Sequence, residues 1–127
     1  MITFYLDIYL GQNNLTGTFP STVGTRRPNN WRFLSLHKNK LTGPLPSGMS
    51  LKNAYMLDFS NNNFYGELPD DITQENFNKL RLLYLNNNAF EGTIPENLMQ
   101  LKKLKGLFLN DNREYILYIC LSFDLLR

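Results

Sequence analysis

Residues 31–46 read WRFLSLHKNKLTGPLP, and residues 80–95 read LRLLYLNNNAFEGTIP. The two stretches agree in the places of their apolar residues, one asparagine, one glycine and a final proline. Apolar and variable residues alternate at the start of each, as in Leu34-Ser35-Leu36, which predicts a short strand with one buried face. Because the pattern recurs along the chain, we expect a stack of similar coils.

Asparagine marks the interval between coils. The recurring residues are spaced 26, 23, 26 and 24 positions apart: Asn13, Asn39, Asn62, Asn88 and Asn112. A buried asparagine offers two donors and an acceptor, so these residues are expected to form a structural ladder that satisfies the backbone of neighbouring coils. Strands one interval apart then pair side by side in a parallel sheet.

Some connections between the strands carry helix signals. In the segment 95–104, Leu98, Leu101 and Leu104 have the spacing of one helix face. The acidic pair Asp70-Asp71 stands where a helix would begin one repeat earlier, and carboxylates stabilise that end of a helix. An acid–base or cation site is the alternative role of this pair. The connection 21–30 is polar and is expected to be irregular.

The pattern resembles the leucine-rich repeats of plant receptor ectodomains, whose consensus is LxxLxLxxNxL(T/S)GxIP. The resemblance implies an α/β solenoid, a right-handed superhelix with a concave parallel sheet and short helical or irregular returns. We predict a repeat domain at 1–112, with repeats at 5–30, 31–53, 54–79 and 80–103 and a partial one at 104–112. A non-repeat tail follows at 113–127.

The resemblance also implies function. Such modules recognise protein or peptide ligands, with a co-receptor as a further partner, in signalling or plant defence. The parent protein is then expected at the extracellular face of the plasma membrane or secreted. The alternatives are a secreted inhibitor of cell-wall enzymes and a non-functional truncated gene product.

The chain departs from such ectodomains at both ends. It has no recognisable signal peptide, membrane span or paired-cysteine cap, which predicts a fragment. The first coil would expose Ile8, Leu10 and Leu15, and an uncapped solenoid end favours self-association. The apolar segment 115–121 is expected either to fold back as a cap or to be translated non-coding sequence.

Residues between the strand leucines predict the binding surface. Aromatic members suit peptide contacts, although an ordinary sheet face is the alternative. The candidate ligand-binding residues are Tyr9, Phe33, Ser35, Asp58, Tyr84 and Phe108. Asn14-Leu15-Thr16 is the one N-x-Ser/Thr sequence, so Asn14 is the candidate glycosylation site.

Other function classes have little support. The chain has one histidine, His37, one cysteine, Cys120, and a net charge of +2. No nucleophile–base pair, kinase motif or cluster of metal ligands is readable. We therefore expect no enzymatic activity, metal or cofactor, and no nucleic-acid partner.

Overall fold

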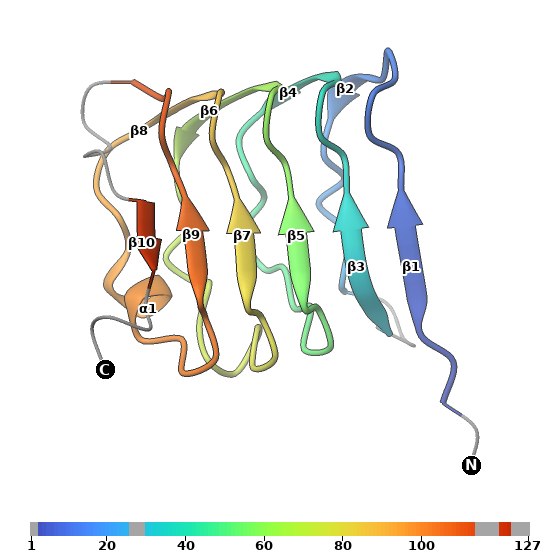
Figure 1. The fold of residues 1–127 in the computed structure, drawn as a ribbon, viewed down its shortest axis with the longest axis vertical. Coiled ribbons are helices and arrows are strands. Elements are labelled where there is room, and N and C mark those ends of the chain that lie inside the picture. Colours follow the sequence, from blue (N-terminus) through green and yellow to red (C-terminus); the bar gives the residue numbers. More distant parts are fainter. Residues whose placement is uncertain (1–2, 26–29, 114–119, 123–127) are drawn as a thin grey trace.

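The strands of one large sheet repeat once per coil. The computed structural model describes residues 3–25, 30–113 and 120–122. Five strands run parallel and side by side in chain order, as Figure 1 shows: β1 (Leu6–Tyr9), β3 (Trp31–Ser35), β5 (Met56–Asp58), β7 (Leu82–Tyr84) and β9 (Gly106–Phe108). The predicted solenoid with a parallel sheet is confirmed, and it has about four turns and little helix.

A sixth strand lies on the far edge of this sheet. Strand β10 (Cys120–Ser122) pairs antiparallel with β9, with Cys120 opposite Phe108 and Ser122 opposite Gly106. This part of the tail therefore folds back on the repeats and covers the edge of β9. Most of the segment 115–121, for which a cap was one expectation, lies outside the described residues.

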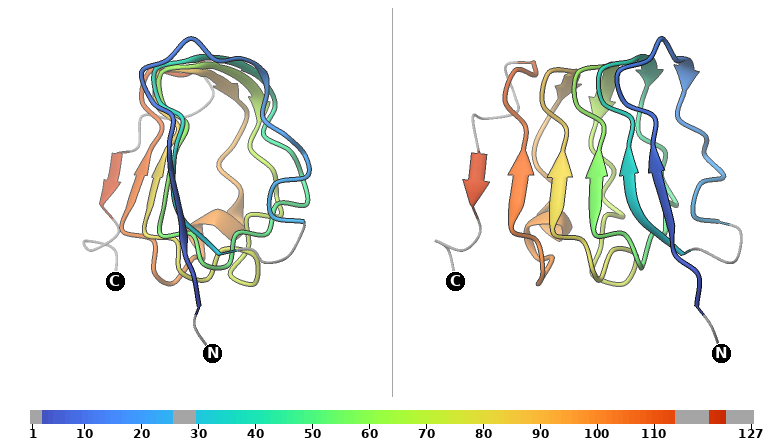
Figure 2. Two further views of the ribbon diagram at one scale, coloured as in Figure 1. Left: turned by 90° about the vertical axis from the view of Figure 1, so that its right-hand side faces the viewer. Right: turned by 45° about the vertical axis from the view of Figure 1, so that its right-hand side comes forward.

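A second, four-stranded sheet lies across the coil from the first, and the sequence patterns did not predict it. Its strands are also parallel and follow chain order: β2 (Thr16–Thr18), β4 (Lys40–Gly43), β6 (Asn63–Glu67) and β8 (Ala89–Glu91). The view along the stack shows each coil closing around an interior between the two sheets (Figure 2). Each of the first four coils therefore contributes one strand to each sheet.

Sharp backbone bends connect the two sheets. The residue before each recurring asparagine has a positive φ of 53° to 58°, and the series is Gln12, Lys38, Asn61, Asn87 and Asp111. This left-handed conformation is costly for side chains other than asparagine, aspartate and glycine. Its presence even at Lys38 shows that stacking of the coils imposes the bend.

Leucine and phenylalanine side chains fill the interior. The ring pairs Phe19–Phe59 and Phe59–Phe64 meet edge to face, with centroids 5.1 Å and 5.8 Å apart, and Phe64 stacks on Phe90 at 6.2 Å. These contacts thus link aromatic side chains of the first, third and fourth coils. Such contacts add about 0.5–1.5 kcal/mol per pair beyond the burial of area.

The helix predictions were only partly right. The one helix among the described residues, α1 (Glu96–Met99), is far shorter than the expected span 95–104. Leu98, Leu101 and Leu104 are nevertheless all buried, because turns after Met99 keep them on the inner side. A single turn suffices to bring the chain back to the sheet.

The expected helix start at Asp70-Asp71 is wrong. Residues 70–77 form successive turns, and a carboxylate oxygen of Asp71 accepts a hydrogen bond from the backbone N–H of Gly48 in the preceding coil. Helix nucleation fixes several residues for one hydrogen bond. Here the contact between coils takes the place of that local structure.

Candidate ligand-binding face

The sheet register aligns one residue from every strand on the open face of the large sheet. Across neighbouring strands Tyr9 stands beside Ser35, then Asp58, Tyr84 and Phe108. These are the residues that the sequence placed between the strand leucines. Their neighbours along each strand, such as Leu34 and Leu57, are buried in the core. We call these five residues the face column.

An aromatic pair ends the face column. The rings of Tyr84 and Phe108 stack with centroids 4.4 Å apart and planes within 3° of parallel. Gly106, two residues before Phe108, is buried, and a Cβ placed there would lie 2.9 Å from Cε2 of Phe108. The glycine therefore leaves room for the Phe108 ring to lie along the sheet. Although β10 covers the strand edge, Phe108 keeps an intermediate exposure.

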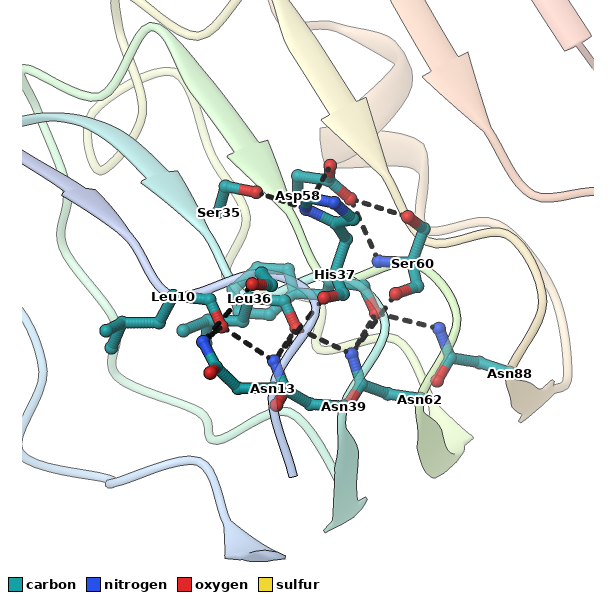
Figure 3. A network of polar contacts seen from close by, with 12 residues as sticks. Leu10, Asn13, Ser35, Leu36, His37, Asn39, Asp58, Ser60, Asn62 and Asn88 are labelled. Carbon is teal, nitrogen blue, oxygen red and sulfur yellow. Dashed lines mark hydrogen bonds and ion pairs between the residues drawn. The ribbon is translucent and has the colours of Figure 1, made fainter. Parts of the chain in front are cut away.

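The centre of the face column is polar. The Ser35 hydroxyl and Nδ1 of His37 share a hydrogen bond of 2.7 Å, and Oδ2 of Asp58 lies 3.7 Å from the same nitrogen (Figure 3). The other oxygen, Oδ1 of Asp58, accepts from the backbone N–H and the hydroxyl of Ser60 at 3.0 Å and 2.7 Å. The Asp58 carboxylate is thus held in place with its side chain 18% exposed.

Ser35 does not fit the expectation of an accessible contact residue. It is only 4% exposed, because its small side chain lies below its neighbours and bonds to His37. His37 and Ser60 instead reach the polar centre. Both lie just past the ends of strands, and the sequence gave no signal of this network, which joins residues from two coils.

The geometry of the polar centre differs from a catalytic triad. In a triad, one imidazole nitrogen faces the serine and the other faces the carboxylate. Here Nδ1 of His37 faces both Ser35 and Asp58. The ring lies against Gly11, where a Cβ would be 2.2 Å from Cε1 of His37. This arrangement orients side chains and does not provide for proton transfer from Ser35 to Asp58.

Another predicted site residue, Phe33, lies in a cluster of aromatic and charged side chains from the first three coils. The guanidinium of Arg32 lies 4.9 Å from the Phe33 ring centroid and binds Asp7 at 2.6 Å. The Phe33 ring meets that of Tyr55 at 5.6 Å. The hydrogen bond from Arg32 holds the pKa of Asp7 below its usual value of 3.8. The Asp7–Arg32 pair therefore contributes to the stability of the fold at pH values above 3.8, and this contribution is lost as the pH falls through the lowered pKa of Asp7.

Tyr9 stands apart from this group. It is 65% exposed at the end of the face column, and its neighbour Ser35 offers no ring to stack on. The structure therefore gathers the predicted site residues in three places: Tyr9 alone, Phe33 beside Arg32, and Asp58 next to the Tyr84–Phe108 pair.

The recurring asparagines lie behind this face, where each coil turns away from the sheet. Nδ2 of Asn62 donates to the carbonyl of Leu36 in the coil before, at 3.0 Å, and to Phe59 and Ser60 in its own coil. Oδ1 of Asn62 accepts from the N–H of Leu41 at 3.1 Å. Figure 3 shows Asn13, Asn39, Asn62 and Asn88 side by side in this ladder. The ladder fixes the spacing of the strands that carry the face column.

Metal sites and membrane-spanning helices are both absent from the described part of the chain. It contains no group of three or more histidine, cysteine or acidic residues arranged to hold a metal ion. Within the same residues, no helix has the length and apolar character needed to span a bilayer.

The comparison with protein families and curated proteins identifies the repeats. The family model described as Leucine Rich Repeat matches residues 54–74 and 79–101. The leucine-rich repeat receptor protein kinase MSL1 of Oryza sativa subsp. japonica is 36% identical over 74 residues, which are 58% of this chain and 5% of the rice protein. The chain thus spans a small part of this relative.

Solved structures of plant receptor kinases also resemble this chain. The ectodomain of the Arabidopsis thaliana membrane receptor kinase GASSHO1/SCHENGEN3, in complex with CASPARIAN STRIP INTEGRITY FACTOR 2, has a TM-score of 0.75 and 32% identity over 84% of this chain and 12% of that one. The Arabidopsis receptor kinase HAESA, in complex with the peptide hormone IDA and the co-receptor SERK1, has a TM-score of 0.70 and 28% identity. That match covers 85% of this chain and 18% of the HAESA chain.

Proposed function

Because this chain is a leucine-rich-repeat solenoid similar to plant receptor-kinase ectodomains, we propose that it recognises a peptide or protein ligand on the open face of its large sheet. The observation that carries the proposal is the stacked pair Tyr84–Phe108 beside the fixed carboxylate of Asp58. Aromatic anchors next to oriented polar groups are typical of binding hot spots. The similar ectodomain of HAESA holds a peptide hormone, which supports the same class of ligand here.

The face column suggests how such a ligand would lie. Neighbouring strands are about 4.8 Å apart, so a peptide that crosses the strands meets successive members of the column. An apolar side chain would pack on Tyr84 and Phe108. A donor group one strand away would reach Asp58, whose Oδ2 lies 3.7 Å from Nδ1 of the partly exposed His37. The ligand class is therefore an extended segment with an apolar residue close to a donor.

The experiment uses a displayed library of random peptides selected on the wild-type chain. We expect peptides to be enriched whose affinity falls about tenfold or more for Tyr84→Ala and for Phe108→Ala, since an anchor contributes about 2 kcal/mol. Each substitution should lower the stability only modestly, by about 0.5–1.5 kcal/mol from the lost stack, because both rings are partly exposed.

Tyr65→Ala is the matched control, because Tyr65 is a 48% exposed aromatic on β6 of the other sheet. Its loss should leave peptide affinity unchanged. Peptides that bind both face variants as tightly as the wild type would show that the site lies elsewhere.

We further propose that the parent protein acts outside the cell in signalling or defence, with a co-receptor as second partner. The support is the similarity to the HAESA ectodomain, whose complex includes a co-receptor. Asn14 is exposed between β1 and β2, as a glycosylated side chain must be. In a secretory host, peptide mass mapping should find Asn14 glycosylated and Asn14→Gln unmodified. Secreted protein with bare Asn14 would count against this location.

A further inference from the structure

Three consecutive turns share a basic pattern. The chain enters β5, β7 and β9 through residues 51–55, 77–81 and 101–105, which read LKNAY, FNKLR and LKKLK. The first and fourth residues of each turn are buried apolar side chains. Six of the nine remaining positions are cationic and none is acidic. The cations, which we call the basic edge, are Lys52, Lys79, Arg81, Lys102, Lys103 and Lys105.

The turns are held in register with one another. The fourth residue of each donates its N–H to the first, as from Ala54 to Leu51 at 2.9 Å. The fifth residues are linked from coil to coil: Lys105 N–H donates to the Arg81 carbonyl at 2.8 Å, and Arg81 N–H to the Tyr55 carbonyl at 2.9 Å. The three turns follow one another along the side of the sheet where the strands begin, below the strands in Figure 1. The first and fourth residues of each turn are buried, whereas the cations are exposed or, for Arg81, partly exposed.

Five of the six cations of the basic edge form no ion pair within the described part of the chain. Across residues 3–25, 30–113 and 120–122, none of the ion pairs involves Lys52, Lys79, Arg81, Lys103 or Lys105. Lys79 donates to the amide oxygen of Asn53 at 2.8 Å, and Arg81 covers the Tyr55 ring at 4.8 Å. Both contacts orient a cation without neutralising it. An anionic partner would relieve the mutual repulsion of these groups.

We propose that the basic edge binds an acidic, extended segment of a partner protein. This surface is distinct from the face column, and its assignment does not depend on that site. A narrow chain fits because acidic side chains of the returns, Glu75 and Glu96, are exposed close by in sequence. Exposed carboxylates that flank the cations in sequence disfavour a broad anionic surface such as a bilayer, which they would repel. A sugar chain commonly stacks on an aromatic ring, yet Arg81 already covers the Tyr55 ring.

The test measures binding of a fluorescent oligo-glutamate peptide by anisotropy. Two double variants carry the same change of net charge, from +2 to −2: Lys103→Glu with Lys105→Glu on the basic edge, and Lys38→Glu with Lys40→Glu beyond the opposite ends of the strands. We expect the wild type and the Lys38→Glu, Lys40→Glu variant to bind the peptide with similar affinity. The Lys103→Glu, Lys105→Glu variant should bind it about tenfold more weakly. Raising salt from about 0.1 M to about 1 M should abolish binding, since the Debye length falls from about 10 Å to about 3 Å.

Further measurements separate the alternatives. Thermal melting should show that both double variants fold like the wild type. Lys103→Gln with Lys105→Gln, which removes charge without reversing it, should give an intermediate affinity. Equal losses in the two Glu variants would mean that only net charge matters and would overturn the proposal. Binding to phosphatidylserine vesicles or to an oligogalacturonate in preference to the peptide would also overturn it.

Discussion

Single asparagine side chains connect one coil to the next. Asn62 is 8% exposed and uses both its amide nitrogen and its oxygen on buried backbone groups. Asn13 is exposed and donates only to Leu10 and Gly11 of its own coil. An asparagine of the ladder therefore contributes more to the stability of the fold where it binds the backbone of a preceding coil, as Asn62 does, than where it binds only its own coil, as Asn13 does.

The difference predicts unequal effects of substitution. Asn62→Ala leaves buried donors and acceptors unpaired, so it should lower the free energy of unfolding by about 1–3 kcal/mol. Asn13→Ala should cost clearly less, because the carbonyls that it binds lie near solvent. Chemical denaturation of both variants measures the comparison, and equal losses would contradict the ladder as the cause.

Strands and bends depend on glycines as well as on apolar residues. Gly17, Gly43, Gly66 and Gly92 recur at one place in four coils and have φ between 84° and 90°. At Gly66 a Cβ would meet only Cβ of Pro44, at 3.7 Å, which is ordinary contact. Space is thus available there, and the backbone conformation alone makes this position unsuitable for other residues.

Gly66→Ala should accordingly destabilise the fold by about 1–2 kcal/mol, the cost of the left-handed conformation for a residue with a Cβ. Gly92 has the same φ of 84°, but there a Cβ would approach Cγ of Glu67 at 2.9 Å. Gly92→Ala should cost at least as much, unless Glu67 moves away. Thermal melts compare the two, and an unchanged melting temperature for Gly66→Ala would refute the conformational argument.

In two of the returns between strands, the local sequence pattern predicts more helix than the structure contains. Leu98, Leu101 and Leu104 have helical spacing, but the helix ends at Met99 and turns complete the inward path. The acidic pair Asp70-Asp71 begins no helix, because Asp71 binds the neighbouring coil. Burial of the leucines could be predicted from spacing, whereas the conformation that buries them depends on the length of each return.

At the scale of the molecule, apolar exposure concentrates at one end of the stack. Among the residues whose exposure the structure describes, six of the seven exposed large hydrophobic side chains fall within residues 4–15. An apolar hollow of about 280 Å³ opens beside them, with Leu10, Leu15 and Trp31 among its lining residues. Exposed apolar surface of this kind favours association.

The 127-residue chain should therefore self-associate in solution at tens of micromolar, about the range where exposed apolar surfaces aggregate. Leu15→Lys should reduce association by placing a charge at the hollow. Tyr65→Lys, at an exposed aromatic far from it, should not. Sedimentation velocity checks all three proteins, and a monomeric wild type would disprove the expectation.

The sequence by itself determined the solenoid, the strand positions and the alignment of the face column. Each depends on a pattern of neighbouring residues that recurs in every coil, so local spacing carries the information. Tertiary structure alone decided the second sheet, the short helix, the burial of Ser35, the Ser35–His37–Asp58 contacts and the Tyr84–Phe108 stack. The His37–Asp58 and Tyr84–Phe108 contacts join residues 21 and 24 positions apart in neighbouring coils, and the burial of Ser35 depends on what surrounds it in the stack. Such pairings follow from how the coils stack, and no single repeat contains them.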